Sequence, residues 1–348
     1  MSAPGLASAL ERLPRQTLAS LPTPFSLAVN LSDRLGIHLW IKRDDLTGLA
    51  FGGNKVRSAE YLVGDAVARG ATSLITTAAA QSNFCRVTAA AGRRAGLRVK
   101  LLLRGTGAEP VQGNLLLDHM LGAELKFTDD PDPYSEHTRG RLESWAGEDR
   151  AAGGRPYVIY IHGGAPAGAL ATAGYVSASL ELDAQCRAAD VRPNHLYVAV
   201  GSGSTLAGLL LGARREGSRL AETRIVGVCV GALSPVVGPR VKDFLRTTAE
   251  LLGTPPLDEE VRLEDGQRGE AYGVPTPAAL DAIRVAAGAE GLLLNPVYTG
   301  KALAALLADV AQGIVQPGTT VVFINTGGDP LVFAYAETLA AIRRGAPH

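Results

Sequence analysis

Apolar runs of strand length alternate along this chain with longer segments that suit helices. The predicted strands cover residues 37–41, 73–76, 99–103, 125–128, 157–161, 196–200, 225–230 and 320–324. The predicted helices cover residues 56–69, 83–95, 113–121, 133–151, 168–188, 205–216, 239–252, 276–289 and 300–313. Nearly continuous apolar strands separated by helices are typical of parallel sheets that helices cover on both faces, so this order predicts an α/β fold.

Composition and charge argue against several classes of partner. The 348 residues include 34 Lys and Arg against 34 Asp and Glu, so the formal net charge is zero and nothing favours nucleic acid or an anionic membrane as partner. Cys85, Cys186 and Cys229 lie far apart in sequence, which predicts neither a disulfide framework nor a metal site. The first residues contain no continuous apolar segment, and no stretch has the roughly 18 apolar residues of a membrane span. We therefore expect a cytoplasmic protein.

Lys55 follows the turn Gly52-Gly53-Asn54 and opens a predicted helix. Six of the 34 basic residues are lysine, so the chain has kept an amine here although it strongly prefers arginine. Glycines let the backbone turn sharply and lie close to a ligand. A lysine amine can lose its proton when it is desolvated and attack a carbonyl, whereas a guanidinium cannot. The position indicates either a reactive lysine or, alternatively, a surface lysine at a helix N-terminus.

Two loops that follow predicted strands are candidate anion-binding sites. In open α/β folds, ligands bind at the carboxyl ends of the strands. Residues 81–83, Gln-Ser-Asn, lie behind three alanines and precede a helix, and an ordinary helix N-cap is the alternative interpretation. Residues 201–205, Gly-Ser-Gly-Ser-Thr, can hold a phosphate with backbone N–H groups and hydroxyls, and a structural turn is the alternative. The spacing of this second loop matches neither a P-loop nor a dinucleotide fingerprint.

A third loop, residues 325–328, places the hydroxyl of Thr326 beside two glycines, where it can meet a flat ring or its nitrogen. Tyr298 and Thr299 precede another predicted helix; taken alone, Tyr298 is expected to be a packed aromatic residue and Lys301 a solvated helix residue. Three features together predict a site for pyridoxal 5'-phosphate: a reactive lysine, a phosphate-binding loop without lysine or arginine, and a hydroxyl at the end of a strand.

The sequence also resembles the tryptophan-synthase-β-like, fold-type-II pyridoxal phosphate enzymes, and within them the branch of D-cysteine desulfhydrase and 1-aminocyclopropane-1-carboxylate deaminase. The segments that carry the resemblance are residues 42–55, 81–83, 201–205, 296–301 and 326–328. It implies two domains, each a twisted, mostly parallel sheet flanked by helices. The larger, cofactor-binding domain would comprise residues 1–56 and 166–348, and the smaller, inserted domain residues 57–165. The resemblance further implies an active site in the cleft between them and a homodimer.

The same resemblance implies roles for individual residues. Lys55 is similar to the lysine that forms the Schiff base with the cofactor, and Ser82 to the hydroxyl near the substrate carboxylate and the reacting carbon. Tyr272 and Tyr298 are similar to the two active-site tyrosines. The residues implied at the cofactor are Lys55, Asn54, Asn83, Gly201, Ser202, Gly203, Ser204, Thr205, Thr299 and Thr326. No metal is implied.

The residue after Tyr298 bears on the substrate, a small amino acid. In the deaminases this position is a glutamate that keeps the pyridine nitrogen protonated for the opening of a cyclopropane ring, whereas here it is Thr299, which supports a protonated ring less. We therefore expect a lyase that eliminates sulfide from D-cysteine, with 1-aminocyclopropane-1-carboxylate deaminase and L-cysteate sulfo-lyase-like activity as alternatives. Residues 84–87, Phe-Cys-Arg-Val, depart from the polar residues common in relatives, so the sequence leaves the substrate and its stereochemistry open.

Two interpretations lie outside this catalytic class. A nucleotide-binding dehydrogenase would also be α/β with glycine loops, but the dinucleotide fingerprint is missing. A non-catalytic pyridoxal phosphate-binding protein would keep Lys55 and residues 201–205 and would need no Ser82, Tyr272 or Tyr298. The absorbance spectrum and an activity panel separate these possibilities.

Overall fold

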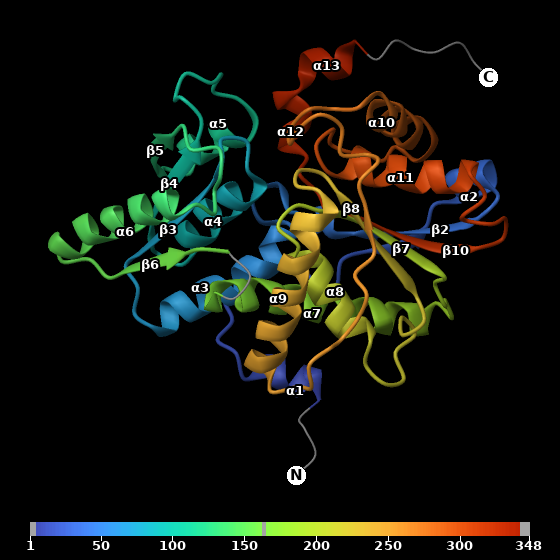
Figure 1. Cartoon of the computed structure of the whole chain (residues 1–348), viewed down its shortest axis with the longest axis horizontal. Coiled ribbons are helices and arrows are strands. Elements are labelled where there is room, and N and C mark those ends of the chain that lie inside the picture. The colour runs from blue at the N-terminus through green and yellow to red at the C-terminus, as the bar shows by residue number, and fades with distance from the viewer. Residues whose placement is uncertain (1–4, 162–164, 342–348) are drawn as a thin grey trace.

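The computed structural model describes residues 5–161 and 165–341, which form two sheets flanked by helices (Figure 1). The larger sheet has the strand order β1-β2-β10-β7-β8-β9, and the smaller sheet has the order β5-β4-β3-β6. Neighbouring strands run parallel except for β1 and β2. The strands are β1 (Phe25–Leu27), β2 (His38–Arg43), β3 (Ser73–Ala79), β4 (Arg98–Arg104), β5 (Glu124–Thr128), β6 (Pro156–Ile159), β7 (His195–Val200), β8 (Arg224–Cys229), β9 (Leu263–Glu264) and β10 (Thr320–Asn325). The predicted α/β class with two mostly parallel sheets is confirmed.

Helices cover both sheets. They are α1 (Leu6–Glu11), α2 (Val29–Leu35), α3 (Lys55–Ala68), α4 (Asn83–Arg94), α5 (Gly113–Met120), α6 (Glu136–Ala151), α7 (Pro166–Ala188), α8 (Ser204–Ala213), α9 (Ser234–Leu252), α10 (Pro277–Glu290), α11 (Thr299–Ala311), α12 (Pro330–Ala334) and α13 (Ala336–Ala340), with single 3-10 turns η1 (Asp44–Leu46) and η2 (Leu49–Phe51). Among the helices that the structure describes, none combines the length and apolar character that a membrane crossing requires.

Strand β10 shows how the larger sheet is buried on both faces. Successive side chains of a strand point to opposite faces. Val322 and Ile324 belong to the apolar core on the side of α7 and α8, whereas Val321 and Phe323 belong to the core on the side of α2, α10 and α11. Figure 1 shows these two groups of helices on opposite sides of the sheet. This two-sided burial explains why the strand reads as a continuous apolar run.

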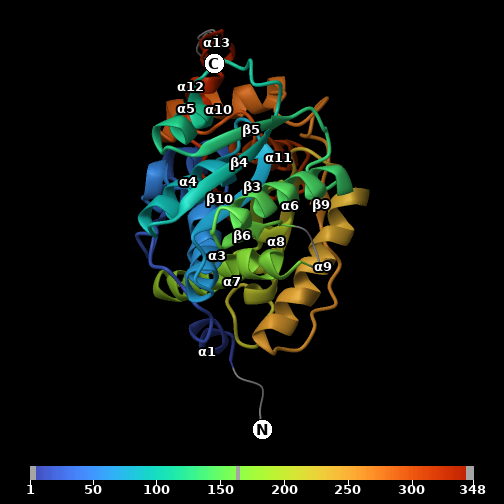
Figure 2. The ribbon, with the colours of Figure 1, turned by 90° about the vertical axis from the view of Figure 1, so that its left-hand side faces the viewer.

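The smaller sheet is layered in the same way. Ile75 of β3 and Leu102 of β4 pack on Leu142 and Trp145 of α6. The neighbouring residue Leu74 belongs to the core on the opposite face, where α4 packs against β3 and β4. Figure 2 shows the four strands side by side, with α4 and α6 on either side of them. In both sheets, the loops that carry the candidate site residues follow the carboxyl ends of the strands.

Helix α3 packs against α7 of the larger part and α4 of the smaller part. The approach to α7 is close, because a Cβ atom added to Gly174 would lie 2.4 Å from the carbonyl oxygen of Arg57. Any side chain at this glycine would push the two helices apart. Since Lys55 is the first residue of α3, this contact helps to fix its position.

Several predicted boundaries were wrong. Helix α9 begins at Ser234 and contains Pro239, which had been expected to start it; Pro235 lies in its first turn, where a missing N–H is tolerated. Helix α6 begins at Glu136 because Ser135 caps it, and strands β1 and β9 were not predicted. The domain limits at residues 57 and 165 stay a prediction, and residues 162–164 near the second limit lie outside the described residues.

Candidate active site

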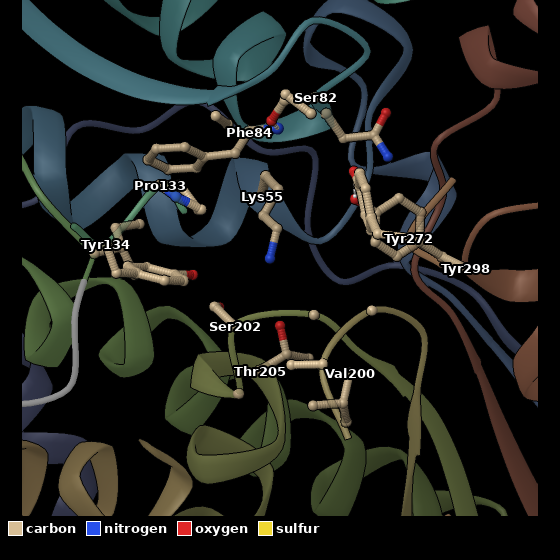
Figure 3. A pocket seen from close by; sticks show the side chains of 18 of the residues that line it. Lys55, Ser82, Phe84, Pro133, Tyr134, Val200, Ser202, Thr205, Tyr272 and Tyr298 are labelled. Carbon is tan, nitrogen blue, oxygen red and sulfur yellow. Dashed lines mark hydrogen bonds between the residues drawn. The ribbon is translucent and has the colours of Figure 1, made fainter. Parts of the chain in front are cut away.

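A cavity of about 460 Å³ lies between the carboxyl ends of the two sheets. Its wall includes the last residue of β3 (Ala79), of β4 (Arg104), of β6 (Ile159) and of β7 (Val200), and the residue after β10 (Thr326). This is where ligands of α/β folds bind. Figure 3 shows the Lys55 side chain entering the cavity, with its amine directed toward the loop that carries Ser202 and Thr205.

Burial alone lowers the pKa of Lys55 to about 8. No carboxylate among the described residues contributes to this pKa, so nothing there compensates for the lost hydration of the ammonium. A large share of the amine is therefore neutral near pH 8, the form that attacks a carbonyl. The interpretation of Lys55 as a surface lysine does not agree with this placement.

The turn before Lys55 has an unusual backbone that other residues hold in place. Ala50 and Phe51 have positive φ angles of 45° and 68°, and Gly52 follows at 62°. A Cβ atom on Gly52 would lie 2.1 Å from the carbonyl oxygen of Asp45, so glycine is required there. Arg86 of α4, which is fully buried, donates hydrogen bonds from Nη1 to the carbonyl of Ala50 and from Nη2 to that of Gly52, the latter at 3.1 Å. Arg86 thus connects this turn to α4.

Residues 201–205 join β7 to α8. Gly203, whose φ angle is 106°, is the N-cap residue of α8. The first-turn N–H groups of a helix have no partner within it, which suits a phosphate. Asn54 connects this loop to Lys55, because its Nδ2 donates to Thr205 Oγ1 at 3.0 Å. Gly201, Ser202, Gly203 and Thr205 line the cavity; Ser204 is buried and is not part of the cavity wall.

Ser82 caps helix α4, since its Oγ accepts hydrogen bonds from the backbone N–H groups of Phe84 at 3.1 Å and Cys85 at 3.3 Å. The N-cap interpretation is therefore right, and Ser82 and Asn83 also line the cavity. The side chain of Asn83 is held by Asn114, whose Nδ2 donates to Asn83 Oδ1 at 2.9 Å. The start of α4 therefore lies at the same cavity as Lys55, where the positive end of a helix dipole favours an anion.

Tyr272 and Tyr298 form one unit on the side of the cavity opposite Tyr134 (Figure 3). Their hydroxyl oxygens are 2.5 Å apart, and their rings meet edge to face with centres separated by 6.0 Å. Burial raises the pKa of both hydroxyls above its ordinary value, so both remain protonated at neutral pH. One of the two donates to the other and leaves one hydroxyl proton for a ligand.

Thr326 lines the cavity, but Thr299 does not. Thr299 is fully buried, and its Oγ1 accepts hydrogen bonds from the backbone N and the Nδ2 of Asn295 at 2.9 and 3.0 Å. The expectation that Lys301 is solvated was wrong. Its side chain is fully buried, its Nζ donates to the carbonyl of Arg268 at 2.6 Å, and burial lowers its pKa to about 8.

Of residues 84–87, which the sequence connected with the substrate, Phe84 lines the cavity, whereas the other three are fully buried outside its wall. The wall also includes residues that the sequence did not indicate, chiefly Arg104, Tyr134 and Arg240. Arg104 ends a strand that was predicted, so its place at the carboxyl edge could have been inferred. Tyr134 precedes α6 and Arg240 lies within α9, and no local signal in the sequence distinguishes them from surface residues.

The described residues fit pyridoxal phosphate. A desolvated amine faces the cavity, a glycine-rich helix start can bind the phosphate, and Thr326 with Asn83 can face a ring. Asn54 joins the amine's turn to the phosphate loop. The cavity volume leaves room for a small substrate beside the cofactor.

Comparison with known proteins agrees with this geometry. The family model described as pyridoxal-phosphate dependent enzyme matches residues 17–327. A putative 1-aminocyclopropane-1-carboxylate deaminase of Pyrococcus furiosus is 38% identical over 339 residues, which cover 97% of this chain and 98% of that protein. A D-cysteine desulfhydrase of Salmonella choleraesuis is 39% identical over 334 residues, 94% of this chain and 97% of that protein. The crystal structure of an ACC deaminase homologue matches with a TM-score of 0.87 and 37% identity, over 98% of this chain and 100% of that one. The chain therefore belongs to the family of pyridoxal-phosphate dependent enzymes.

Proposed function

We propose that this protein is a pyridoxal phosphate-dependent lyase that eliminates the β-substituent of a small amino acid, with D-cysteine as the first substrate to test. The observation that carries the proposal is the placement of the Lys55 amine in one cavity with Ser82 and the Tyr272–Tyr298 pair. In balanced form, D-cysteine and one water give pyruvate, ammonium and hydrogen sulfide. The carbon–sulfur bond breaks, and its electron pair leaves on sulfur.

When bound, pyridoxal phosphate withdraws electrons from the α-carbon of the substrate through its ring. The amine of Lys55, whose pKa is about 8, can accept the α-proton near neutral pH. The start of α4, with Ser82 and Asn83, binds and orients the substrate carboxylate. Residues 201–205 hold the phosphate through the start of α8.

The paired hydroxyls of Tyr272 and Tyr298 are suited to the leaving group. Because burial raises the pKa of both, they keep their protons at neutral pH and can donate one toward a departing sulfur atom. Their mutual hydrogen bond fixes the direction of the donor. This role requires no metal ion.

Thr299 supports elimination over ring opening. Its hydroxyl oxygen accepts hydrogen bonds from Asn295 and it does not line the cavity, and a threonine at this position supplies no carboxylate to a pyridine nitrogen. Opening a cyclopropane ring demands stronger electron withdrawal than expelling sulfide. The relative named as a putative 1-aminocyclopropane-1-carboxylate deaminase keeps ring opening as the second candidate, and an L-cysteate sulfo-lyase-like activity remains the third.

The first test is the absorbance spectrum of the purified protein. We expect a visible band from cofactor attached covalently to Lys55, which borohydride removes, and no such band in Lys55→Ala. Lys242→Ala is the matched control, because Lys242 is an exposed lysine outside the cavity wall. A protein that stays colourless after incubation with pyridoxal phosphate would contradict the proposal.

The second test is a substrate panel assayed for pyruvate and sulfide from D-cysteine, L-cysteine and β-chloro-D-alanine, and for 2-oxobutyrate from the cyclopropane substrate. We expect pyruvate and little or no 2-oxobutyrate, since Thr299 cannot supply a carboxylate. Efficient 2-oxobutyrate formation would overturn the argument from Thr299. A coloured protein that turns over neither these compounds nor L-cysteate would favour a non-catalytic cofactor-binding protein.

We also propose a homodimer in the cytoplasm, on the strength of the family resemblance. Sedimentation equilibrium of the purified protein tests the dimer. A monomer at micromolar concentration would contradict it.

A further inference from the structure

Two arginines line the same cavity beside the groups described above. Arg104 is the last residue of β4, and Arg240 comes from α9, so they reach the cavity from the smaller and the larger part of the molecule. The Cζ atom of Arg104 lies 5.9 Å from the centre of the Tyr272 ring, and that of Arg240 lies 4.4 Å from the centre of the Tyr134 ring. Both side chains are half-buried.

Both guanidinium groups act on Tyr134, Arg240 from above its ring and Arg104 through its charge. Burial raises the pKa of the Tyr134 hydroxyl, and the positive charges of Arg240 and Arg104 both oppose this rise, so both lie within electrostatic reach of it. Tyr134 in turn packs edge to face on Tyr160, which also lines the cavity. The arginines and tyrosines thus form one wall, called here the arginine wall: Arg104, Tyr134, Tyr160 and Arg240.

The positive charge of this wall is not neutralised within residues 5–161 and 165–341. Arg104 Nη1 donates to the carbonyl of Pro131 at 3.0 Å, which leaves its other N–H groups for a ligand. No ion pair joins Arg104 or Arg240 to a carboxylate of these residues. The acidic residue in this part of the cavity wall is Asp132, which is exposed and accepts the backbone N–H of Tyr134 at 2.9 Å.

The two anionic groups that the proposed function assigns to the cavity, the cofactor phosphate and the substrate carboxylate, do not require these arginines. The start of α8 with residues 201–205 suits the cofactor phosphate, and the start of α4 with Ser82 suits the substrate carboxylate. A guanidinium presents a planar fork of donors that matches sulfonate, phosphate or carboxylate oxygens. Two such groups on one wall therefore indicate a third anion.

We infer that the arginine wall binds an oxyanion at the end of the substrate side chain. This inference rests on the proposed function for the amine and the carboxylate of the substrate, and it extends the substrate class from D-cysteine to amino acids whose β-substituent is a sulfonate or a phosphate. With cysteate, one water is consumed and pyruvate, ammonium and hydrogen sulfite form. The carbon–sulfur bond breaks, and its electron pair stays on sulfur.

The first test measures binding and not turnover. The holoenzyme is titrated by calorimetry with 3-sulfopropanoate and with propanoate, which differ by the sulfonate and carry no amine. We expect the wild-type protein to bind 3-sulfopropanoate about tenfold more tightly or better, as charge-assisted hydrogen bonds allow, and Arg104→Gln and Arg240→Gln to remove most of this ratio. Arg98→Gln is the control, because Arg98 lies exposed at the other end of β4 and pairs with Asp149. Equal affinity for both ligands in the wild-type protein overturns the inference.

A second measurement separates the side-chain anion from the cofactor phosphate. The dissociation constant of pyridoxal phosphate is expected to change less than about threefold in Arg104→Gln and Arg240→Gln, because the helix start of α8 holds the phosphate. Variants that lose the cofactor and keep the sulfonate preference would assign the arginines to the phosphate and overturn the inference. If no amino acid is turned over and the sulfonate preference persists, the inference stands and the proposed lyase function fails.

Discussion

Arg57, two residues after Lys55, is the centre of a buried ionic cluster that fixes the start of α3. Its guanidinium donates to both oxygens of Asp44, at 2.9 and 2.8 Å, and to both oxygens of Glu181, at 3.0 and 2.9 Å. The Arg57 and Asp44 side chains are each about 1% exposed. The cluster therefore joins η1, α3 and α7 beneath the active-site turn.

Replacing Arg57 by methionine keeps an unbranched side chain about as long as the arginine up to Nε and removes the guanidinium with its charge. Among the described residues Asp44 would retain hydrogen bonds from Tyr175 and Thr23, at 2.6 and 2.8 Å, but it would lose its ion-pair partner and keep only the charge of Lys42, which pairs with Glu181. Breaking a buried ion pair by removing one partner costs about 3–5 kcal/mol. We therefore expect Arg57→Met to lower the free energy of unfolding in urea, followed by circular dichroism, by about 3–5 kcal/mol.

Arg69→Met is the control at the C-cap of the same helix, because Arg69 is 66% exposed and its partner Asp65 keeps a hydrogen bond from Tyr157 at 2.6 Å when the arginine is lost. An ion pair whose cation lies in water contributes about 1 kcal/mol or less. If Arg57→Met costs no more than this control, the cluster does not stabilise the fold by charge pairing and the reasoning is wrong.

The pH dependence gives a second check on the same cluster. Burial alone would raise the pKa of Asp44 and of Glu181, but Arg57 holds both below the ordinary value. Their contribution to stability is therefore present above the unfolded-state pKa and is lost as the pH falls through the lower folded-state pKa. In Arg57→Met the pKa of Asp44 rises instead, so protonation relieves the buried charge. The difference in stability between wild type and variant should shrink as the pH falls from 7 toward 4, and a constant difference would contradict this account.

Two further substitutions test the positions around Lys55. Ser82→Ala should keep the cofactor band, lose about 1 kcal/mol of stability with its N-cap hydrogen bonds, and lose most of its turnover, which urea unfolding and steady-state kinetics measure together; unchanged kinetics would show that Ser82 acts as a cap alone. Arg86→Gln should release the strained turn at Ala50 and Gly52 and displace Lys55. Because small displacements of a reacting group are costly, we expect the attachment of cofactor to Lys55, trapped with borohydride, to slow by about tenfold or more. An unchanged attachment rate would mean that the turn holds its shape without Arg86.

The buried strands could be predicted because burial on both faces leaves a local trace in the sequence. Strand β10 reads as Thr-Val-Val-Phe-Ile-Asn, and its predicted and observed bounds differ by one residue. Strands β1 and β9, with three and two residues, are too short to show any periodicity and exist because a neighbouring strand pairs with them. The start of α9 was missed because a proline inside a pattern usually ends or begins a helix.

The site could be predicted in part for the same reason. Glycine turns and helix starts are local features, so residues 52–55, 81–83 and 201–205 were identified from spacing, and the structure brings them around one cavity. Side-chain burial is not local. Lys301 was expected in water and is buried against the carbonyl of Arg268, and Arg240 was not expected at the cavity, because both depend on segments far away in the chain.

The contrast between Lys55 and Arg57 shows which part of the chemistry the sequence alone could not supply. Both basic residues lie in the first turn of α3, and burial opposes the charge of both. The pKa of Arg57 is nevertheless raised, because Asp44 and Glu181 come from other elements to meet its guanidinium. Lys55 meets no such carboxylate in the described part of the chain, and its pKa falls to about 8. The amine at position 55 is therefore reactive because the fold places Asp44 and Glu181 against Arg57 and not against Lys55. A carboxylate introduced beside Lys55 should raise the pKa of the amine and slow its attack on a carbonyl at neutral pH.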